Sequence, residues 1–534
     1  MSEQQYDFII VGAGSAGSVL ANRLTANGRW KVLLLEAGDA SHPVSWMPAS
    51  FGLLINNPAA NWLYSSAPEP GTRNRRIPVP RGKLLGGSSA INGLVFVRGQ
   101  ALDYDTWSQL GNRGWSFESV LPLFQRMEHF ESGAGELRAE NGPLRVSEVA
   151  DRNPLYDAWF AAAEELGIPP NPDYNGARQE GIVKTQTTIS NGRRMSTAHC
   201  YLKPARGRPN LTIVTNALVH RVLLDGTRCT GVRYAHKGQT IDARAAREVL
   251  LSAGGVASPQ ILELSGIGDP QVLSTHGINI EHALPAVGEN LRDHINARIQ
   301  WEVTRSGVSY NERVRGYRRY LQGARYLLRR DGFMSLPSAP LLGFLRTRGE
   351  LDNPDVQMHL VPYTIKDPKR RLLMDQPGMT MACYQLRPES LGSIHIQSAT
   401  AGENPQILFN FLHDPIDQRT MVDGFKLIRK LANTRALDGL RGAELSPGSE
   451  VSTDAEILEW IRAHAETAYH PIGTCRMGPQ GPTTVVDDQL RVHGLTGLRI
   501  ADASIFPTMP SGNTNAPAIM VGEKASDLVH AATR

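Results

Sequence analysis

Residues 6–36, YDFIIVGAGSAGSVLANRLTANGRWKVLLLE, decide the fold of this chain. They begin with β-branched and aromatic residues, which predict a short buried strand over 6–11. A glycine-rich turn follows, then a helical pattern over 18–26 and a second strand-like run over 30–35. This order predicts a βαβ unit at the start of an α/β fold.

The turn between the first strand and the helix has the spacing that binds a dinucleotide. Gly12 makes the tight turn, Gly14 lets the backbone approach a pyrophosphate, and Gly17 lets the helix pack against the strand. The helix N-terminus then offers free N–H groups to the phosphates. Glu36, at the end of the second strand, can bind a ribose and disfavours a 2′-phosphate. The motif alone leaves NAD and FAD open.

Two further glycine-containing motifs follow. The stretch 81–99 (RGKLLGGSSAINGLVFVRG) would let the backbone pass close to a flat ligand, and its Asn92 could bond a ring edge. The stretch 254–268 (GGVASPQILELSGIG) follows a strand-like run over 248–252. It predicts a helix that starts at 258–259 and ends at 265–266.

Together these motifs resemble the glucose–methanol–choline (GMC) flavoprotein oxidoreductases, in particular the bacterial alcohol and choline dehydrogenase branch. The resemblance runs from residue 6 to about 528. Residues 82–105 and 254–268 are similar to the two family signatures, with Gly255 where the second usually has Ala, Ser, Thr or Pro. The remaining similar stretches are 61–62, 285–294 (PAVGENLRDH), 469–478 (YHPIGTCRMG) and 502–517 (DASIFPTMPSGNTNAP).

The resemblance implies an α/β fold with an FAD-binding Rossmann-type domain and an inserted α+β substrate domain on an antiparallel sheet. The nucleotide motifs lie in 1–155, 195–295 and 465–534, which we expect to form the FAD domain. Segments 156–194 and 296–464 lack them and are expected to form the substrate domain. The latter contain strand-like runs at 356–361, 379–385 and 392–397.

FAD is the cofactor that the resemblance implies. Some members attach it covalently through a histidine just before the asparagine of the first signature, and that position is Ile91 here. We therefore expect noncovalent FAD. The implied contact residues are Gly12, Gly14, Ser15, Ala16, Gly17, Glu36, Ala37, Trp62, Gly86, Gly87, Asn92, Gly93, Leu94, Val95, Val219, Ala253, Tyr469, Asp502, Ala503 and Thr514.

Oxidation of an alcohol removes a hydroxyl proton and a hydride from carbon. Flavin N5 can take the hydride. An imidazole can take the proton, because its ordinary pKa of about 6.5 leaves it mostly neutral at pH 7. By resemblance His470 is this base and Asn513 is its partner at the substrate oxygen, with Asn515 as the competitor for the partner role. His464 and His470 lack the HExxH arrangement, so no metal site is expected.

The expected reaction is FAD-dependent oxidation of an uncharged primary alcohol to the aldehyde. Segment 335–342 (SLPSAPLL) has no carboxylate, and Pro340 stands about where choline-oxidising relatives carry a glutamate. We expect this segment to form an apolar cavity wall, the alternative being that it packs elsewhere. A choline dehydrogenase and a hydroxynitrile-lyase-type enzyme remain alternatives. Oxygen, a quinone or another acceptor could reoxidise the flavin.

Composition and charge bear on the binding partners and the cellular location of the protein. A net charge of +4 with no aromatic-rich basic block argues against nucleic acid. No apolar run is long enough for a spanning helix, there is no secretory signal, and the four cysteines are widely separated, so we expect a cytoplasmic protein. Residues 313–330 (RVRGYRRYLQGARYLLRR) predict an amphipathic surface helix. We expect it to be solvated, with peripheral contact at the inner face of the membrane as the alternative.

Overall fold

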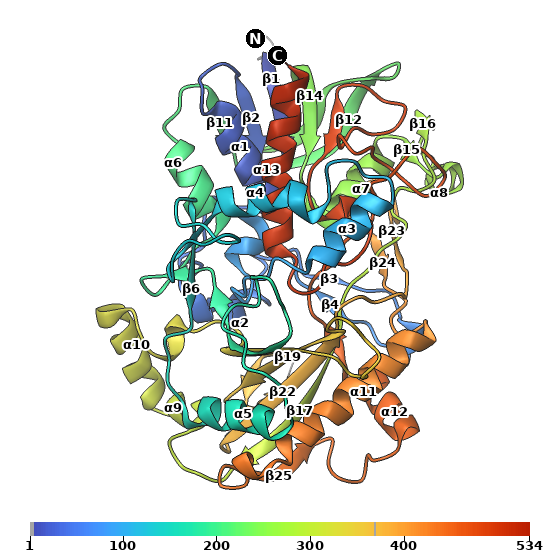
Figure 1. Ribbon diagram of the computed structural model, residues 1–534. Coiled ribbons are helices and arrows are strands. Elements are labelled where there is room, and N and C mark those ends of the chain that lie inside the picture. Colours follow the sequence, from blue (N-terminus) through green and yellow to red (C-terminus); the bar gives the residue numbers. More distant parts are fainter. Residues whose placement is uncertain (1–4, 368–369, 534) are drawn as a thin grey trace.

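The computed structural model describes residues 5–367 and 370–533. Two seven-stranded sheets dominate it, one at each end of an elongated molecule, and the two chain ends lie close together beside the first sheet (Figure 1). The first sheet contains the βαβ unit that the sequence predicts. The second is built from the middle of the chain.

The first sheet has the order β11-β2-β1-β14-β13-β12, with β27 added beside β14. The pairs β11–β2, β2–β1, β1–β14 and β14–β27 are parallel, whereas β12, β13 and β14 form an antiparallel extension. The strands are β1 (Gln5–Val11), β2 (Val32–Leu35), β11 (Leu211–Val214), β12 (Ala217–Asp225), β13 (Arg228–His236), β14 (Gln239–Leu251) and β27 (Leu498–Ile500).

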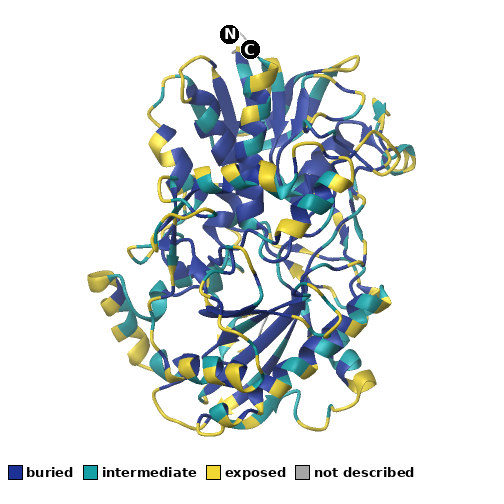
Figure 2. Cartoon of the chain, viewed as in Figure 1, coloured by how far each residue is buried: buried dark blue, intermediate teal, exposed yellow. Residues whose placement is uncertain are grey.

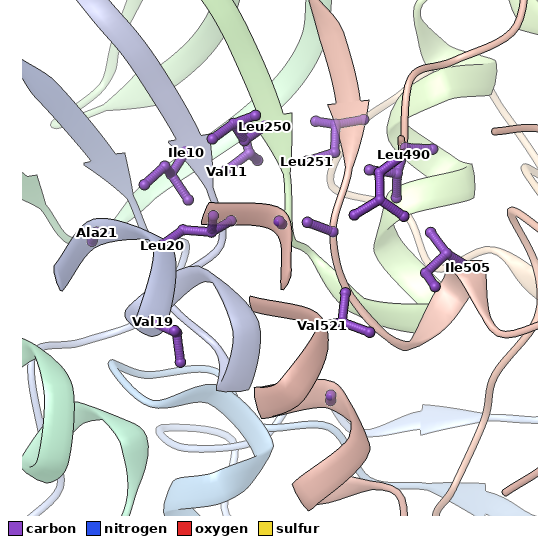
Figure 3. Close-up of a cluster of buried hydrophobic side chains, with 14 of the residues drawn as sticks. Ile10, Val11, Val19, Leu20, Ala21, Leu250, Leu251, Leu490, Ile505 and Val521 are labelled. Carbon is purple, nitrogen blue, oxygen red and sulfur yellow. The ribbon is translucent and has the colours of Figure 1, made fainter. Parts of the chain in front are cut away.

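Two helices from opposite ends of the chain pack side by side on this sheet: α1 (Ser15–Thr25) and α13 (Asn515–Ala532) (Figure 1). They approach so closely that a Cβ on Gly522 would lie 2.7 Å from the Ala16 carbonyl oxygen. Arg23 of α1 donates two hydrogen bonds to the buried Glu523 carboxylate of α13, at 2.9 and 2.7 Å. Apolar side chains of both helices and of β1 and β14 form one core beneath them (Figure 3).

The second sheet has the order β25-β17-β22-β19-β18-β7, with β26 beside β17, and every pair is antiparallel. Helices cover its outer face, their buried sides toward the sheet and their exposed sides outward (Figure 2). The strands are β7 (Gly181–Lys184), β17 (Ile295–Val303), β18 (Leu341–Leu345), β19 (Val356–Val361), β22 (Gly378–Gln385), β25 (Arg441–Ser446) and β26 (Glu466–Thr467), and the helices are α5 (Pro154–Glu165), α11 (Pro415–Ala432) and α12 (Asp454–His464).

Shorter elements connect the two sheets. The helices among them are α2 (Phe51–Leu54), α3 (Ala101–Gln109), α4 (Phe117–Met127), α6 (Lys203–Ala205), α7 (Gly254–Leu264), α8 (Pro270–Thr275), α9 (Tyr310–Arg313) and α10 (Arg318–Arg329). The short strands are β3 (Tyr64–Ser65), β4 (Pro78–Val79), β5 (Glu128–Phe130), β6 (Leu144–Glu148), β8 (Gln186–Thr187), β9 (Ile189–Ser190), β10 (Arg193–Arg194), β15 (Ile267–Gly268), β16 (His282–Ala283), β20 (Ile365–Asp367), β21 (Leu372–Leu373), β23 (Ser393–His395) and β24 (Gln406–Leu408).

The predicted fold class is confirmed, with corrections in detail. Helix α7 begins four residues before the predicted start, so Pro259 lies inside it. The proline is accommodated because the carbonyl of Gly255, four residues earlier, accepts a hydrogen bond from Thr474 Oγ1 at 2.7 Å instead. The predicted strand near 392–397 forms β23, which pairs with β24 outside the large sheet. Strand β26, which the sequence placed in the FAD segment, joins the second sheet.

Helix α10 carries the predicted amphipathic pattern with its apolar stripe turned outward. Tyr326 faces inward, donates a hydrogen bond to the Gly192 carbonyl at 2.7 Å and stacks on Trp46. The opposite face exposes Tyr317, Tyr320, Leu321, Leu327 and Leu328. Across the described residues, no helix combines the length and the hydropathy needed to cross a bilayer.

Candidate active site

A cleft with two adjoining chambers lies between the sheets. The first chamber encloses about 1170 Å³ and the second about 1460 Å³, counting space open to solvent. Both chambers are lined by Ser15, Arg81, Ser88, Ala503 and Ala518, so they are continuous. The cleft can therefore hold one long ligand that runs from the first sheet toward the second.

The glycine-rich turn between β1 and α1 forms one wall of the first chamber. A Cβ on Gly12 would lie 2.5 Å from the Ser252 oxygen, and one on Gly17 would lie 1.9 Å from the Gly12 oxygen. Packing alone therefore requires glycine at both positions. A Cβ on Gly14 would meet only the Ser252 oxygen, at 4.0 Å. The space in front of Gly14 is therefore open, as close approach of a phosphate to the backbone requires.

Glu36 links this turn to the end of β2. Its carboxylate accepts hydrogen bonds from the backbone N–H groups of Ala13 and Gly38, both at 2.9 Å. Burial raises the pKa of Glu36 to about 7, and the two N–H donors oppose that shift. The same side chain lines the first chamber, together with Val219 of β12. Glu36 thus fixes the turn and leaves carboxylate surface for a ligand.

The second glycine cluster forms the floor where the chambers meet. Gly86 and Gly87 have φ values of +91° and +51°, and a Cβ on Gly87 would lie 2.8 Å from the Gly14 Cα. The cluster therefore packs directly on the first turn. The Asn92 side-chain oxygen accepts from the Arg194 guanidinium at 2.8 Å and the Leu94 N–H at 3.1 Å, which holds the next residues against the second chamber.

The cleft brings together nearly all the residues that the sequence selected. Gly17 and Gly86 do not line it and act instead in the packing of the two turns. The first chamber is lined by Gly12, Gly14, Ser15, Ala16, Glu36, Ala37, Trp62, Gly87, Val219, Ala253, Asp502 and Ala503. The second is lined by Asn92, Gly93, Leu94, Val95, Tyr469, His470, Asn513 and Thr514.

His470 and Asn513 lie side by side on the wall of the second chamber. The distance between His470 Nε2 and Asn513 Nδ2 is 3.1 Å. Burial lowers the pKa of His470 well below 6.5, and the nearby His294, Arg81 and His359 lower it further. The imidazole is therefore neutral near pH 7. Asn515 also reaches this chamber, but its oxygen accepts a hydrogen bond from Ser15 Oγ at 2.8 Å.

Sequence reasoning missed the groups that hold His470. One carboxylate oxygen of Asp293 accepts from the backbone N–H groups of both His294 and His470, each at 2.8 Å. The His294 Nδ1 lies 2.9 Å from the His470 Nδ1. Asn513 Oδ1 accepts from Gln357 Nε2 at 3.2 Å. The only sequence signal was that stretch 285–294 resembled the family, without any role for its last two residues.

Cationic side chains line the second chamber together with the aromatic rings of Phe51, Tyr363, Tyr384 and Tyr469. Arg81, Arg298 and Arg371 line it, and Glu466 pairs with the last two from behind. Within the part of the chain that the structure describes, no Asp or Glu is among the lining residues. The expected apolar wall at 335–342 is wrong: of this segment only Ser338 lines the chamber. Leu341 packs into the core on the outer face of the second sheet, and Leu342 packs beneath chamber-lining residues such as Val361 and Tyr384 without reaching the cavity.

Comparison with known sequences decides the family. The N-terminal profile of the GMC oxidoreductases matches residues 6–296, and the C-terminal profile matches residues 388–522. The chain belongs to the GMC oxidoreductase family. The cleft, its glycine turns and the His470–Asn513 pair are therefore features of a GMC oxidoreductase.

Named relatives of this GMC oxidoreductase include bacterial enzymes. The oxygen-dependent choline dehydrogenase of Brucella suis biovar 1 is 42% identical over 526 residues, covering 98% of this chain and 95% of its own. That of Paraburkholderia phytofirmans is 40% identical over 536 residues, covering 99% and 95%. These two relatives match the chain over nearly its full length.

Solved structures show the same fold. Pyridoxine 4-oxidase from Mesorbium loti has a TM-score of 0.89 at 28% identity and covers 98% of this chain and 99% of its own. A formate oxidase variant from Aspergillus oryzae RIB40 has a TM-score of 0.92 at 27% identity and covers 100% and 99%. This GMC oxidoreductase is an FAD-dependent enzyme that oxidises alcohols. Its continuous cleft and the open space at Gly14 fit a long dinucleotide such as FAD.

Proposed function

We propose that the enzyme oxidises an uncharged primary alcohol to the aldehyde, with His470 as the base and Asn513 as a donor to the substrate oxygen. The observation that carries this proposal is the 3.1 Å contact between His470 Nε2 and Asn513 Nδ2 on the wall of the second chamber. Both groups thus face the same point in space. Bound FAD would supply the acceptor for the hydride that leaves the alcohol carbon.

The two side chains divide the work on the alcohol oxygen. The neutral His470 imidazole accepts the hydroxyl proton, because its lowered pKa keeps the ring unprotonated near pH 7. Without substrate, the Asn513 amide nitrogen donates to His470 Nε2; when the alcohol hydroxyl takes that place, the amide can donate to the developing alkoxide instead. The carbon then gives up its hydride as the C–O bond becomes a carbonyl.

The chamber wall supports an uncharged substrate over choline. A buried quaternary cation needs a carboxylate or an aromatic cage, or it loses its hydration energy without compensation. Tyr363, Tyr384 and Tyr469 also line the chamber, so aromatic faces are present. No carboxylate of the described residues lines it, and Arg298 and Arg371 would repel a cation. The named choline dehydrogenases are nevertheless close relatives, so choline is the main alternative substrate.

Anaerobic flavin reduction tests the reaction and the substrate class together. Benzyl alcohol or 1-hexanol should bleach the flavin with a higher kcat/KM than choline. Choline as the best substrate would overturn the uncharged class. No bleaching by any alcohol, with turnover of a cyanohydrin, would favour the hydroxynitrile-lyase alternative. Reoxidation of the reduced enzyme by air or by a quinone would then identify the acceptor.

We also propose how FAD divides between the chambers. The first chamber would hold the ADP half beside Gly14 and Glu36, and the second would hold the flavin beside 92–95 and Tyr469. The two sheets support a division into an FAD domain of 1–155, 195–295 and 465–534 and a substrate domain of 156–194 and 296–464, except that β26 of the last FAD segment belongs to the second sheet. Ile91 lines the second chamber and cannot bond to a flavin, so acid precipitation should release all FAD to the supernatant.

Helix α10 supports a further proposal, contact with an anionic lipid surface. Its exposed stripe includes Leu327 and Leu328, which are 66% and 84% exposed. Exposed arginines of the same helix flank the stripe, among them Arg318 and Arg329. Apolar side chains beside arginines are the pattern that inserts into the headgroup region of anionic bilayers.

Vesicle sedimentation tests this lipid contact. The enzyme should pellet with phosphatidylglycerol vesicles and remain in solution with phosphatidylcholine vesicles. Leu328→Glu should abolish pelleting, because it places a carboxylate in the inserted stripe. Ile280→Glu is the matched control, since Ile280 is 50% exposed on a loop beside the first sheet. Wild-type protein that stays in solution with both vesicles would overturn the proposal.

A further inference from the structure

His294 is a fully buried histidine in contact with the proposed base, and no step described so far uses it. Its ring lies between two partners: Nε2 is 2.9 Å from the Leu386 carbonyl oxygen, and Nδ1 is 2.9 Å from the His470 Nδ1. The ring also stacks on Tyr384, with centroids 4.5 Å apart. These contacts fix its position and its orientation.

The Leu386 carbonyl determines which nitrogen of His294 carries the proton. A carbonyl oxygen can only accept, so His294 Nε2 must be the N–H that donates to it. Burial lowers the pKa of His294 to about 4, so the ring is neutral and carries no second proton. His294 Nδ1 is therefore a bare acceptor that points at His470.

His294 in turn determines which nitrogen of His470 carries the proton. Because His294 Nδ1 is an acceptor at 2.9 Å, the His470 Nδ1 must be an N–H that donates to it. His470 is also neutral, so its Nε2 has no proton. This is the nitrogen that faces Asn513 and the chamber. Without substrate, the Nε2 electron pair therefore accepts from the Asn513 amide at 3.1 Å, on the wall of the chamber in which the alcohol would bind.

We propose that His294 is a positioning residue that fixes the tautomer of His470, so that Nε2 is always the proton acceptor. The proposal rests on the proposed function, since it assumes that His470 is the base. The Leu386 carbonyl starts the chain and Asp293 fixes the backbone of both histidines. A serine-protease triad uses a carboxylate for the same task, and there a wrong tautomer lowers kcat by about 10⁴-fold.

Once His470 has taken the substrate proton, the contact between His294 Nδ1 and His470 Nδ1 also stabilises the imidazolium. The imidazolium donates from Nδ1 to the neutral His294 ring, which remains an acceptor. No proton needs to move to His294, because its Nε2 proton is already engaged by Leu386. The proton therefore stays on His470 Nε2 until it passes to solvent water after the aldehyde has left.

Two amide substitutions separate this role from simple space filling. His294→Asn places an oxygen near the Nδ1 position and keeps the acceptor for His470. His294→Gln places its amide nearer the Leu386 carbonyl, fills more of the space and loses that acceptor. Leaving a buried N–H without an acceptor costs about 1–3 kcal/mol, so His294→Gln should lower the rate constant of anaerobic flavin reduction by about 5- to 150-fold. His294→Asn should stay within about fivefold of wild type.

The measurement is the limiting rate constant of flavin reduction at saturating benzyl alcohol, with FAD content, Tm and substrate Kd recorded for each variant. Fixing the tautomer predicts that Asn is faster than Gln, with the difference in the rate constant and not in Kd. A purely structural role predicts the reverse order, because Gln fills the site better. Equal rates, or a faster Gln variant, would overturn the proposal.

Two further arms keep the outcomes distinct. If His470→Ala reduces at the wild-type rate, the proposed base fails, whatever the His294 variants do. If His470→Ala is slow while the two His294 variants are equal, only the positioning role fails. Where neither variant yields holoenzyme, histidine-labelled wild-type holoenzyme decides by two-bond ¹H–¹⁵N correlation. A proton on His470 Nδ1 supports the proposal, and one on Nε2 overturns it.

Discussion

The two chambers of the cleft are built from different parts of the polypeptide. The first is shaped largely by backbone: glycines in close contact, the N-terminal turn of α1, and the Ala13 and Gly38 N–H groups that hold the carboxylate of Glu36. The second is shaped by side chains that come from several separated segments, including His470, Asn513 and Arg298. A backbone-built site tolerates no added atom where two backbone segments touch, as at Gly12 and Gly17, whereas a side-chain-built site can lose one group and keep its shape.

The largest effect is expected in the backbone-built chamber. Gly17→Ala would place Cβ 1.9 Å from the Gly12 oxygen, so α1 would have to separate from the turn. We expect a destabilisation above about 4 kcal/mol, seen as loss of soluble protein or a large fall in Tm.

Gly14→Ala is the matched control, because its Cβ meets only one protein atom, at 4.0 Å. This variant should keep the Tm of the apoprotein but lose bound FAD, measured as the ratio of flavin to protein absorbance. If Gly14→Ala and Gly17→Ala lowered Tm equally, the space in front of Gly14 would not be open as described.

In the side-chain-built chamber, His470→Ala should leave FAD bound but slow the anaerobic reduction of the flavin. General-base catalysis typically contributes about 10²–10⁴ in rate. Asn513→Ala should lose less, because it removes one neutral donor. His395→Ala is the control: this histidine pairs with Glu263 and Glu289 outside the cleft, so its loss should change Tm and not the reduction rate. Wild-type reduction by His470→Ala would place the base elsewhere.

Glu36→Gln tests whether the first chamber uses any side-chain chemistry. Charge-assisted hydrogen bonds are worth about 1.5–3 kcal/mol, so the Kd for FAD should rise roughly 10- to 150-fold. Glu69→Gln is the control, since burial also raises the pKa of Glu69 to about 7 and it also accepts from two backbone N–H groups. Glu69 does not line the cleft. An equal rise in Kd for both variants would mean that Glu36 acts only through folding.

The smallest effect concerns pH. The neutral form of His470 is the base, and its pKa is lowered by burial, so activity should be lost only as pH falls well below 6.5. Between pH 6.5 and 8, kcat/KM should change by less than about twofold. Even a histidine with the ordinary pKa of about 6.5 would be at most half protonated in this range, and the pKa of His470 is lower. If kcat/KM instead fell to half its maximum at pH 6.5 or above, the His470 imidazole would not be desolvated as the structure indicates.

The contrast between the chambers also explains what the sequence could predict. The first chamber follows from local order, since strand, turn, helix and Glu36 lie within 31 consecutive residues, 6–36. The second chamber depends on strand pairing across the antiparallel sheet, which local patterns do not encode. His470 and Asn513 were found through family resemblance, and the resemblance gave no role to His294. The segment 335–342 was misplaced because its last two residues begin β18, where Leu341 and Leu342 are buried in the cores on either face of the second sheet.

The pairing of α1 with α13 has a consequence for how the enzyme is made. Ser15 and its partner Asn515 are 500 residues apart, and β27 also joins the first sheet late in the chain. A ribosome that adds roughly 5–20 residues per second needs about 25–100 s to bridge this interval. During that time the glycine turn is present without the helix that covers it. Asp502, Ala503 and Ala518, which line the first chamber, are therefore added only when synthesis has nearly ended, and a chain that stops before them lacks this part of the wall.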